Sequence, residues 1–153
     1  MDVETLDKIT NLANTLLKDH NLEGWRFKWG NSKRRLGMCS FKEKTIEVSL
    51  WYVGSTSDEE LEDTVRHEIA HAVVGSGHGH DYVWKRAAIQ LGARPQSCAP
   101  DHVQSAAQPN YIIECSNCKK RWERFRLRKE LRREGVKSSC CRAPLTFYRV
   151  KRG

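Results

Sequence analysis

The chain has 153 residues, of which 39% are hydrophobic and 30% charged. This suits one modest core or two small units, and it excludes a large multidomain enzyme and a disordered or fibrous chain. No run of the sequence approaches the roughly 18 apolar residues of a membrane span. Residues 1–5 lack the basic start and apolar stretch of a signal peptide. We expect a cytoplasmic, nucleoid or nuclear monomer that is not secreted and does not bind membranes.

Charge is distributed unevenly along the chain. The net charge is +8, but residues 115–153 carry 14 basic and 3 acidic side chains, a net of +11. Residues 1–114 carry 13 basic and 16 acidic side chains, a net of −3. A near-neutral body with a basic C-terminal segment predicts a polyanionic partner, foremost DNA. A solvated basic segment that only aids solubility is the alternative.

The first elements are predicted by the spacing of apolar residues. Residues 5–19 place apolar side chains three and four positions apart, which predicts an amphipathic helix with Thr5 as its cap. Segments 25–29, 36–41 and 45–51 then have strand character and are separated by polar turns. We expect them to form a three-stranded antiparallel meander.

Two further helices are predicted after these strands. Ser57 and Glu60 form a capping box, and the apolar stripe that follows continues to Gly75. A second helix is expected over residues 81–91, with Gly92 at its C-terminal end. The sequence therefore predicts an α+β domain.

The first of these helices carries His67-Glu68-Ile69-Ala70-His71, an HExxH motif. Residues four apart lie one turn above each other, so the two imidazoles face the same way and can bind one Zn²⁺. Glu68 lies beside a ligand and can take a proton from a zinc-activated water that attacks a peptide carbonyl. The pattern favours a catalytic zinc over two surface histidines of a helix.

A catalytic zinc takes three protein ligands and keeps one position open. His78 and His80 follow the helix, and the glycines beside them let the chain turn back. The residues alone leave both histidines as candidates and favour His80, because it adjoins the next helix. His20 and His102 lie outside this cluster.

The motif and the segment Gly77-His-Gly-His80-Asp-Tyr-Val-Trp84 resemble the Spartan-related, SprT-like family of zinc metallopeptidases. In that family the third zinc ligand is the histidine of an HGxxW or HGxxF segment, which corresponds to His80, with Asp81 in place of the usual glycine. The resemblance implies a gluzincin-like α+β metallopeptidase domain, a zinc cofactor, and protein substrates that are associated with or crosslinked to DNA.

The C-terminal segment is similar to the zinc ribbon that closes many SprT-like proteins. We expect a metallopeptidase domain over residues 1–95, a linker over 96–110 and a basic, β-rich ribbon over 111–153. The candidate ligands of a structural zinc are Cys115, Cys118, Cys140 and Cys141.

One position of the ribbon departs from the usual pair of CxxC motifs. Ser138 stands three residues before Cys141, where a second such motif has cysteine. Cys140, a histidine, Cys98 or water can fill that place. The alternative is a ribbon that keeps its shape without metal through its apolar side chains.

Basic side chains alternate with two aromatic residues between the cysteine pairs. Arginine and lysine can neutralise phosphates while Trp122 and Phe125 stack on unpaired bases, although both rings also suit a small core. No motif that reads bases is present, so binding is expected to favour single-stranded or nonspecific DNA. The candidate contacts are Lys119, Lys120, Arg121, Trp122, Arg124, Arg126, Arg128, Lys129, Arg132 and Arg133.

Three functions follow from these features. The first is a zinc-dependent endopeptidase of SprT-like type with His67, His71 and His80 as ligands and Glu68 as general base. The second is a non-catalytic, zinc-containing module that binds or regulates nucleic acid; a purely structural site has no need of Glu68, which counts against it. The third is zinc-dependent hydrolysis of a bond other than a peptide. Tyr52 and Tyr82 are candidates for a second stabiliser of the oxyanion.

Overall fold

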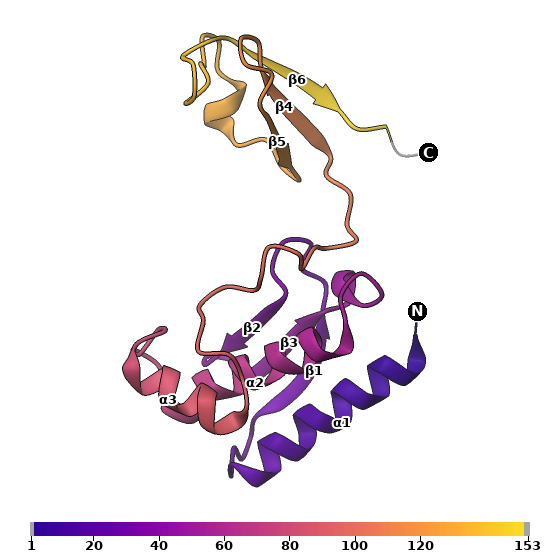
Figure 1. Ribbon diagram of the computed structural model, residues 1–153, viewed down its shortest axis with the longest axis vertical. Coiled ribbons are helices and arrows are strands. Elements are labelled where there is room, and N and C mark those ends of the chain that lie inside the picture. The colour runs from indigo at the N-terminus through magenta and orange to yellow at the C-terminus, as the bar shows by residue number, and fades with distance from the viewer. Residues whose placement is uncertain (1, 152–153) are drawn as a thin grey trace. The chain divides into compact units, whose positions relative to one another are not determined.

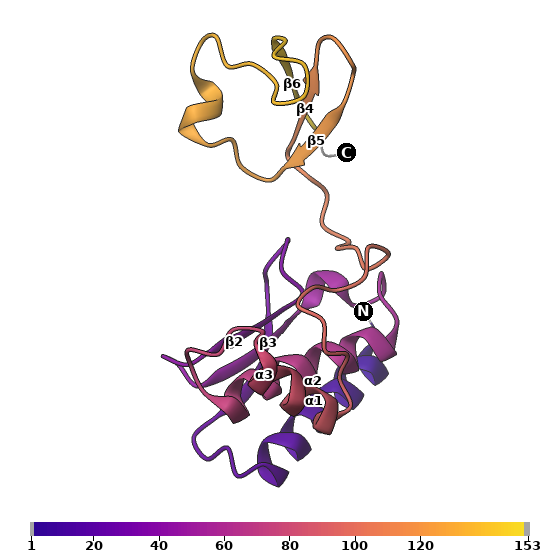
Figure 2. The ribbon, with the colours of Figure 1, turned by 60° about the vertical axis from the view of Figure 1, so that its left-hand side comes forward.

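The computed structural model describes residues 2–151. The chain forms two compact units, Met1–Ala107 and Gln108–Gly153, which are shown in Figures 1 and 2. Within residues 2–151, no helix is long and apolar enough to cross a membrane.

The first unit contains three α-helices and a small sheet among its described residues. Its elements are α1 (Val3–Asp19), β1 (Arg26–Gly30), β2 (Gly37–Ser40), β3 (Thr45–Ser49), the 3-10 helix η1 (Leu50–Tyr52), α2 (Asp58–Val74) and α3 (Tyr82–Leu91). The α+β class is thus confirmed.

The sheet differs from the expected antiparallel meander. Its strand order is β1-β3-β2, with β1 parallel and β2 antiparallel to β3. The central strand is the most buried, because four of the five residues of β3 are inaccessible to solvent and Ile46 and Val48 belong to the core. The short turn after β2 lets β2 and β3 pair as a hairpin. The loop after β1 instead carries the chain past β3 to the opposite edge of the sheet, where β2 begins. The prediction was wrong because pairing order depends on contacts distant in sequence.

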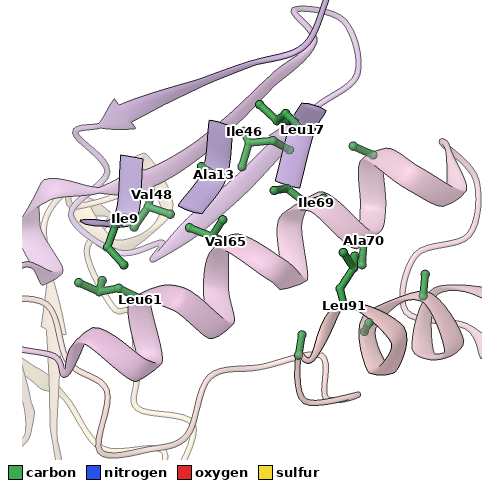
Figure 3. Packing of buried hydrophobic residues seen from close by; sticks show 14 of the residues in the cluster. Ile9, Ala13, Leu17, Ile46, Val48, Leu61, Val65, Ile69, Ala70 and Leu91 are labelled. Carbon is green, nitrogen blue, oxygen red and sulfur yellow. The ribbon is translucent and has the colours of Figure 1, made fainter. Parts of the chain in front are cut away.

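The core lies between α1, the sheet and α2. Figure 3 shows side chains of α1, β3 and α2 meeting in one cluster, and α3 contributes from the other side of α2. Ile9, Ile46, Leu61, Val65 and Ile69 are all fully buried there. Because α2 is buried by both α1 and the sheet, the residues of its HExxH motif are held on a rigid element.

The predicted N-terminal cap is correct for α2 but not for α1. The Ser57 side chain accepts a hydrogen bond from the Glu60 N–H, so the predicted cap of α2 is confirmed. The expected cap of α1 was wrong: Asp2 caps this helix by accepting from the Glu4 N–H. Thr5 instead lies buried inside the helix, where its hydroxyl donates to Asp58 at 2.9 Å.

The segment after α3 also differs from expectation. Residues 96–107, expected to belong to a linker, are part of the first unit. The Ala106 N–H donates to the Trp51 carbonyl, and the Ser55 hydroxyl donates to the Gln104 carbonyl. These bonds fasten the segment to the region around η1.

The second unit is a small antiparallel sheet with strand order β5-β4-β6. Its elements are β4 (Tyr111–Cys115), β5 (Arg121–Arg124), the 3-10 helix η2 (Lys129–Arg132) and β6 (Leu145–Arg149). Ile113 of β4 is buried and pairs in register with Trp122 on one side and Phe147 on the other. The architecture is compatible with a zinc ribbon.

Candidate metal centre and active site

Three histidines converge at the C-terminal half of α2. The helix presents His67 and His71 one turn apart, and His80 arrives from the loop before α3. The Nε2 atom of His80 lies 3.0 Å from Nε2 of His67 and 3.1 Å from Nε2 of His71. Ligands 2.0–2.1 Å from a tetrahedral zinc lie about 3.3 Å from one another. The spacing and the donor set therefore fit zinc.

The loop between α2 and α3 brings the third histidine back to the helix. Gly75 ends α2 with φ 85°, and Gly79 has φ 53°, conformations that other residues adopt at a cost. Asp81 then caps α3 by accepting from the Trp84 N–H at 3.1 Å. Its other carboxylate oxygen contacts Nδ1 of His78 at 3.0 Å. His78 is thus held by Asp81, and His80 joins the cluster.

The ring of Trp84 packs against all three imidazoles. Its side chain is fully buried, and its ring centroid lies 4.6 Å from those of His67 and His80 and 5.2 Å from that of His71. Its indole N–H donates to the His67 carbonyl at 3.4 Å. In the sequence analysis Trp84 was part of the family motif, but no role was predicted for it. Its position four residues after His80, in the first turn of α3, is the signal that places it there.

Burial keeps the histidines neutral. It lowers the pKa of His67 to about 4, with the charges of His71 and His80 as further causes. Burial also lowers the pKa of His71 to about 4, and it lowers that of His80. At neutral pH the three rings are therefore unprotonated, which is the form that binds a metal.

Glu68 is buried beside the histidines, with 9% of its surface exposed. Burial raises the pKa of this carboxyl group to about 7, and the positive charge of Arg35 opposes the shift. Strand β2 lies very close to Glu68: a Cβ atom on Gly37 would lie 2.8 Å from its Oε1 and 2.6 Å from Cγ2 of Thr64. Only glycine fits at this position without displacing the carboxylate.

Glu68 and His67 open into a cleft of about 530 Å³. Its walls come from the loop before β2, from α2 and from the segment after α3. That last wall is fastened to α2, because Arg94 binds Glu60 through both terminal nitrogens and Asp63 at 3.2 Å. The lining residues include Arg34, Arg35, Gly37, Tyr52, Asp63, Thr64, Arg94, Cys98, Asp101 and Val103.

The two tyrosines considered as oxyanion stabilisers occupy different places. Tyr52 is buried and lines the cleft together with Glu68. Burial raises the pKa of its phenol, so the hydroxyl keeps its proton at neutral pH. Tyr82 is 72% exposed at the start of α3 and lies beside Arg86. Of the two, Tyr52 has the position to reach a substrate.

The comparison with protein families matches this unit. The model of the SprT-like family matches residues 6–104, which is more than half of the chain. The chain belongs to the SprT-like family. This family is associated with metallopeptidase-like domains, and the three histidines and Glu68 lie within the matched residues. No curated protein matches the chain.

Beyond the SprT-like domain, four thiols converge in the second unit. The sulfur atoms of Cys115, Cys118, Cys140 and Cys141 all lie within 4.8 Å of one another. Sγ of Cys118 is 3.5 Å from Sγ of Cys140, close to the roughly 3.8 Å between sulfurs around a tetrahedral zinc. The donor set fits zinc.

The departure at Ser138 has a structural explanation. Its buried hydroxyl accepts hydrogen bonds from the N–H groups of Cys141 and Ala143 and orders the turn between them. A contact of 3.3 Å between Cys115 and this hydroxyl is the largest cause that lowers the pKa of Cys115 to about 6. The sulfur of Cys140 completes the cluster, whereas Cys98 belongs to the first unit.

The basic residues of the second unit are spread over several elements. Lys119 and Lys120 precede β5, Arg121 and Arg124 lie on it, and Arg126, Arg128, Lys129, Arg132 and Arg133 follow it. All are exposed except Arg124, which is half-buried. Glu114 binds Arg121 at 2.7 Å and Lys119 at 3.9 Å, so these two are partly neutralised.

The aromatic residues of this unit differ in exposure. Trp122 and Phe125 are half-buried, and Trp122 lines a small hollow with Ile113. Phe147 and Tyr148 of β6, which were not among the candidate contacts, are 40% and 46% exposed. Their adjacency was the available signal, because neighbouring side chains of a strand point to opposite faces of the sheet. They add exposed ring surface to a basic unit.

Proposed function

We propose that the chain is a zinc-dependent endopeptidase that hydrolyses peptide bonds of proteins bound or crosslinked to DNA. The convergence of three neutral imidazoles, with Nε2 of His80 3.0 Å and 3.1 Å from Nε2 of His67 and His71, beside a buried glutamate carries the peptidase part. A structural site of three histidines needs no carboxyl group, whereas hydrolysis needs a base within reach of the attacking water. Membership of the SprT-like family supports the same activity.

The residues divide the catalytic work as follows. His67, His71 and His80 would hold a zinc ion, which when bound would lower the pKa of a water molecule and polarise the scissile carbonyl. Glu68 would accept a proton from the attacking water and return it to the leaving nitrogen. The Tyr52 hydroxyl donates a hydrogen bond to the oxygen that becomes negative. Trp84 fixes the three imidazoles, and the close approach of Gly37 fixes Glu68.

The DNA part of the proposal is supported by the second unit. Residues 115–153 carry a net charge of +11, and the exposed rings of Phe147 and Tyr148 offer stacking surfaces. Exposed lysine and arginine neutralise phosphates regardless of base sequence. A substrate protein attached to DNA is then brought to the SprT-like domain by the nucleic acid.

The test is cleavage of a DNA-bound basic protein by the zinc-loaded chain, with and without single-stranded DNA. Glu68→Gln is the inactive variant and Glu59→Gln, an exposed residue on the same helix, is its matched control. We expect cleavage that DNA stimulates, that Glu59→Gln retains and that Glu68→Gln loses. Equal inertness of the wild type and Glu68→Gln, with zinc and DNA still bound, would instead establish a non-catalytic module.

A further inference from the structure

Two arginines line the cleft beside the residues of the proposed catalysis. Arg34 and Arg35 lie in the loop between β1 and β2 and line the same cleft as His67 and Glu68. Both side chains are exposed, and neither forms an ion pair with any group of residues 2–151. A pair of adjacent guanidinium groups beside the reacting centre thus has no ion-pair partner among the described residues, although the charge of Arg35 acts on the buried carboxyl group of Glu68.

The other charged residues that the structure describes in the cleft form no ion pair with Arg34 or Arg35. Arg94 and Asp63 are engaged with each other, and Arg94 also binds Glu60. Asp101 lines the cleft from the segment after α3, more than 60 positions along the chain, and forms no ion pair with Arg34 or Arg35 among the described residues. The loop before β2 therefore presents positive charge to whatever enters.

The loop that carries Arg34 and Arg35 leads into a strand at the edge of the sheet. Leu36 and Gly37 continue directly from Arg35 into β2, which is an edge strand of the sheet and lies against Glu68. An extended polypeptide can pair with such a free edge. A polypeptide laid along β2 brings its side chains to Arg34 and Arg35 as its backbone reaches Glu68. The volume of about 530 Å³ suits peptide side chains and is too small for a nucleic-acid duplex.

We propose that Arg34 and Arg35 select substrates that carry an acidic side chain next to the scissile peptide bond. The planar guanidinium fork matches the two oxygens of a carboxylate. The arginines bind the substrate and set its register, while the chemistry stays with the zinc site and Glu68. This inference rests on the proposed peptidase activity and adds a specificity to it.

The experiment uses three fluorogenic peptides that differ at one position beside the scissile bond, with Glu, Gln or Lys. Cleavage by the full zinc-loaded chain gives kcat and KM, and fluorescence anisotropy with Glu68→Gln gives the Kd of each uncleaved peptide. The variants are the double substitutions Arg34→Gln with Arg35→Gln and Arg34→Glu with Arg35→Glu. Lys33→Gln is the matched control, because it removes one positive charge from the same loop without lining the cleft.

We expect the wild type and Lys33→Gln to prefer the Glu peptide over the Gln peptide by about tenfold in KM and Kd, with kcat little changed. The double glutamine variant loses this preference. The double glutamate variant prefers the Lys peptide, a gain that misfolding cannot produce. Raising the salt concentration weakens each preference because the pairs are exposed.

Three results would overturn the inference. One is equal treatment of the three peptides by the wild type, which leaves the peptidase proposal standing. Another is a preference that survives both double variants. The third is a loss of affinity for single-stranded DNA in the double glutamine variant with peptide preference unchanged, which assigns the arginines to nucleic acid. If none of the peptides is cleaved, the proposed peptidase activity is contradicted instead. The anisotropy measurement then tests by itself whether the chain prefers acidic peptides.

Discussion

At the scale of single residues, Trp84 shows how the metal centre is supported. A fully buried indole contacts three imidazoles from one side and bonds the backbone of one of them. Groups that orient ligands from behind commonly affect metal affinity by about 10–100-fold. The centre is therefore built from four side chains in contact, although only three of them can bind the metal.

Replacing Trp84 by Phe is expected to weaken zinc binding about tenfold, because the smaller ring leaves the imidazoles loose and the bond to the His67 carbonyl is lost. Competition with a chromophoric chelator measures the affinity. Ile89→Ala, at an exposed position of the same helix, serves as the control. Unchanged affinity in Trp84→Phe would mean that the three histidines need no support from the indole.

Gly37→Ala is expected to lower kcat at least 100-fold while zinc binding persists. The added methyl would lie 2.6–2.8 Å from Thr64 and Glu68, and a misplaced catalytic group costs about two orders of magnitude. Gly30→Ala on β1 is the matched control, because its methyl meets mainly the flexible end of Glu47. Full activity of Gly37→Ala would show that Glu68 tolerates displacement.

At the scale of elements, the wall after α3 depends on one ion-pair cluster on α2. The guanidinium of Arg94 contacts the carboxylates of Glu60 and Asp63, and the backbone N–H of Arg94 donates a hydrogen bond to Asp63 at 2.9 Å. The hydrogen bond from Arg94 is the largest cause that lowers the pKa of Glu60. A carboxyl group with a lowered pKa stabilises the folded state above its unfolded pKa of 4.5, and the contribution is lost as the pH falls through the lowered value.

Arg94→Met is therefore expected to reduce the free energy of unfolding by about 1 kcal/mol at pH 7, since the pair is partly exposed and screened. The loss becomes smaller as the pH falls through the lowered pKa of Glu60, because the carboxyl group is then increasingly protonated in both proteins. Urea unfolding at pH 7 and at pH 3.5 measures this difference. An equal loss at both pH values would show that the contribution of Arg94 is packing rather than charge.

At the scale of the whole molecule, the two units hold separate donor sets. The first contains the three histidines and the second the four thiols. Histidine and thiolate sets of these sizes are typical of a catalytic zinc with an open position and of a closed structural zinc, respectively. We therefore predict two zinc ions per chain.

Native mass spectrometry is expected to show two zinc ions in the wild type and one in Cys140→Ala, which removes a thiol of the second unit. Ser139→Ala, the exposed neighbour, retains both ions. His71→Ala also lowers the count to one, and combining it with Cys140→Ala leaves none. Two ions in Cys140→Ala would show that the remaining three thiols suffice or that Ser138 supplies the fourth ligand.

The sequence by itself determined the elements and groups that depend on neighbouring residues. The spacing of apolar side chains located the helices, Ser57 and Glu60 located the start of α2, and the HExxH spacing placed His67 and His71 on one face. These features are local because a helix repeats every 3.6 residues and its caps bond within one turn. The family followed from the same local motifs.

Only the tertiary structure decided what depends on contacts between distant segments. It placed β1 parallel to β3, brought His80 against the histidines of α2, brought Cys140 into the thiol cluster and fastened residues 96–107 to the first unit. It also assembled one cleft from Glu68, the arginines before β2 and the segment after α3. Each of these features depends on which segments distant in sequence are buried against each other. The local spacing of apolar residues does not identify the segment against which an element packs.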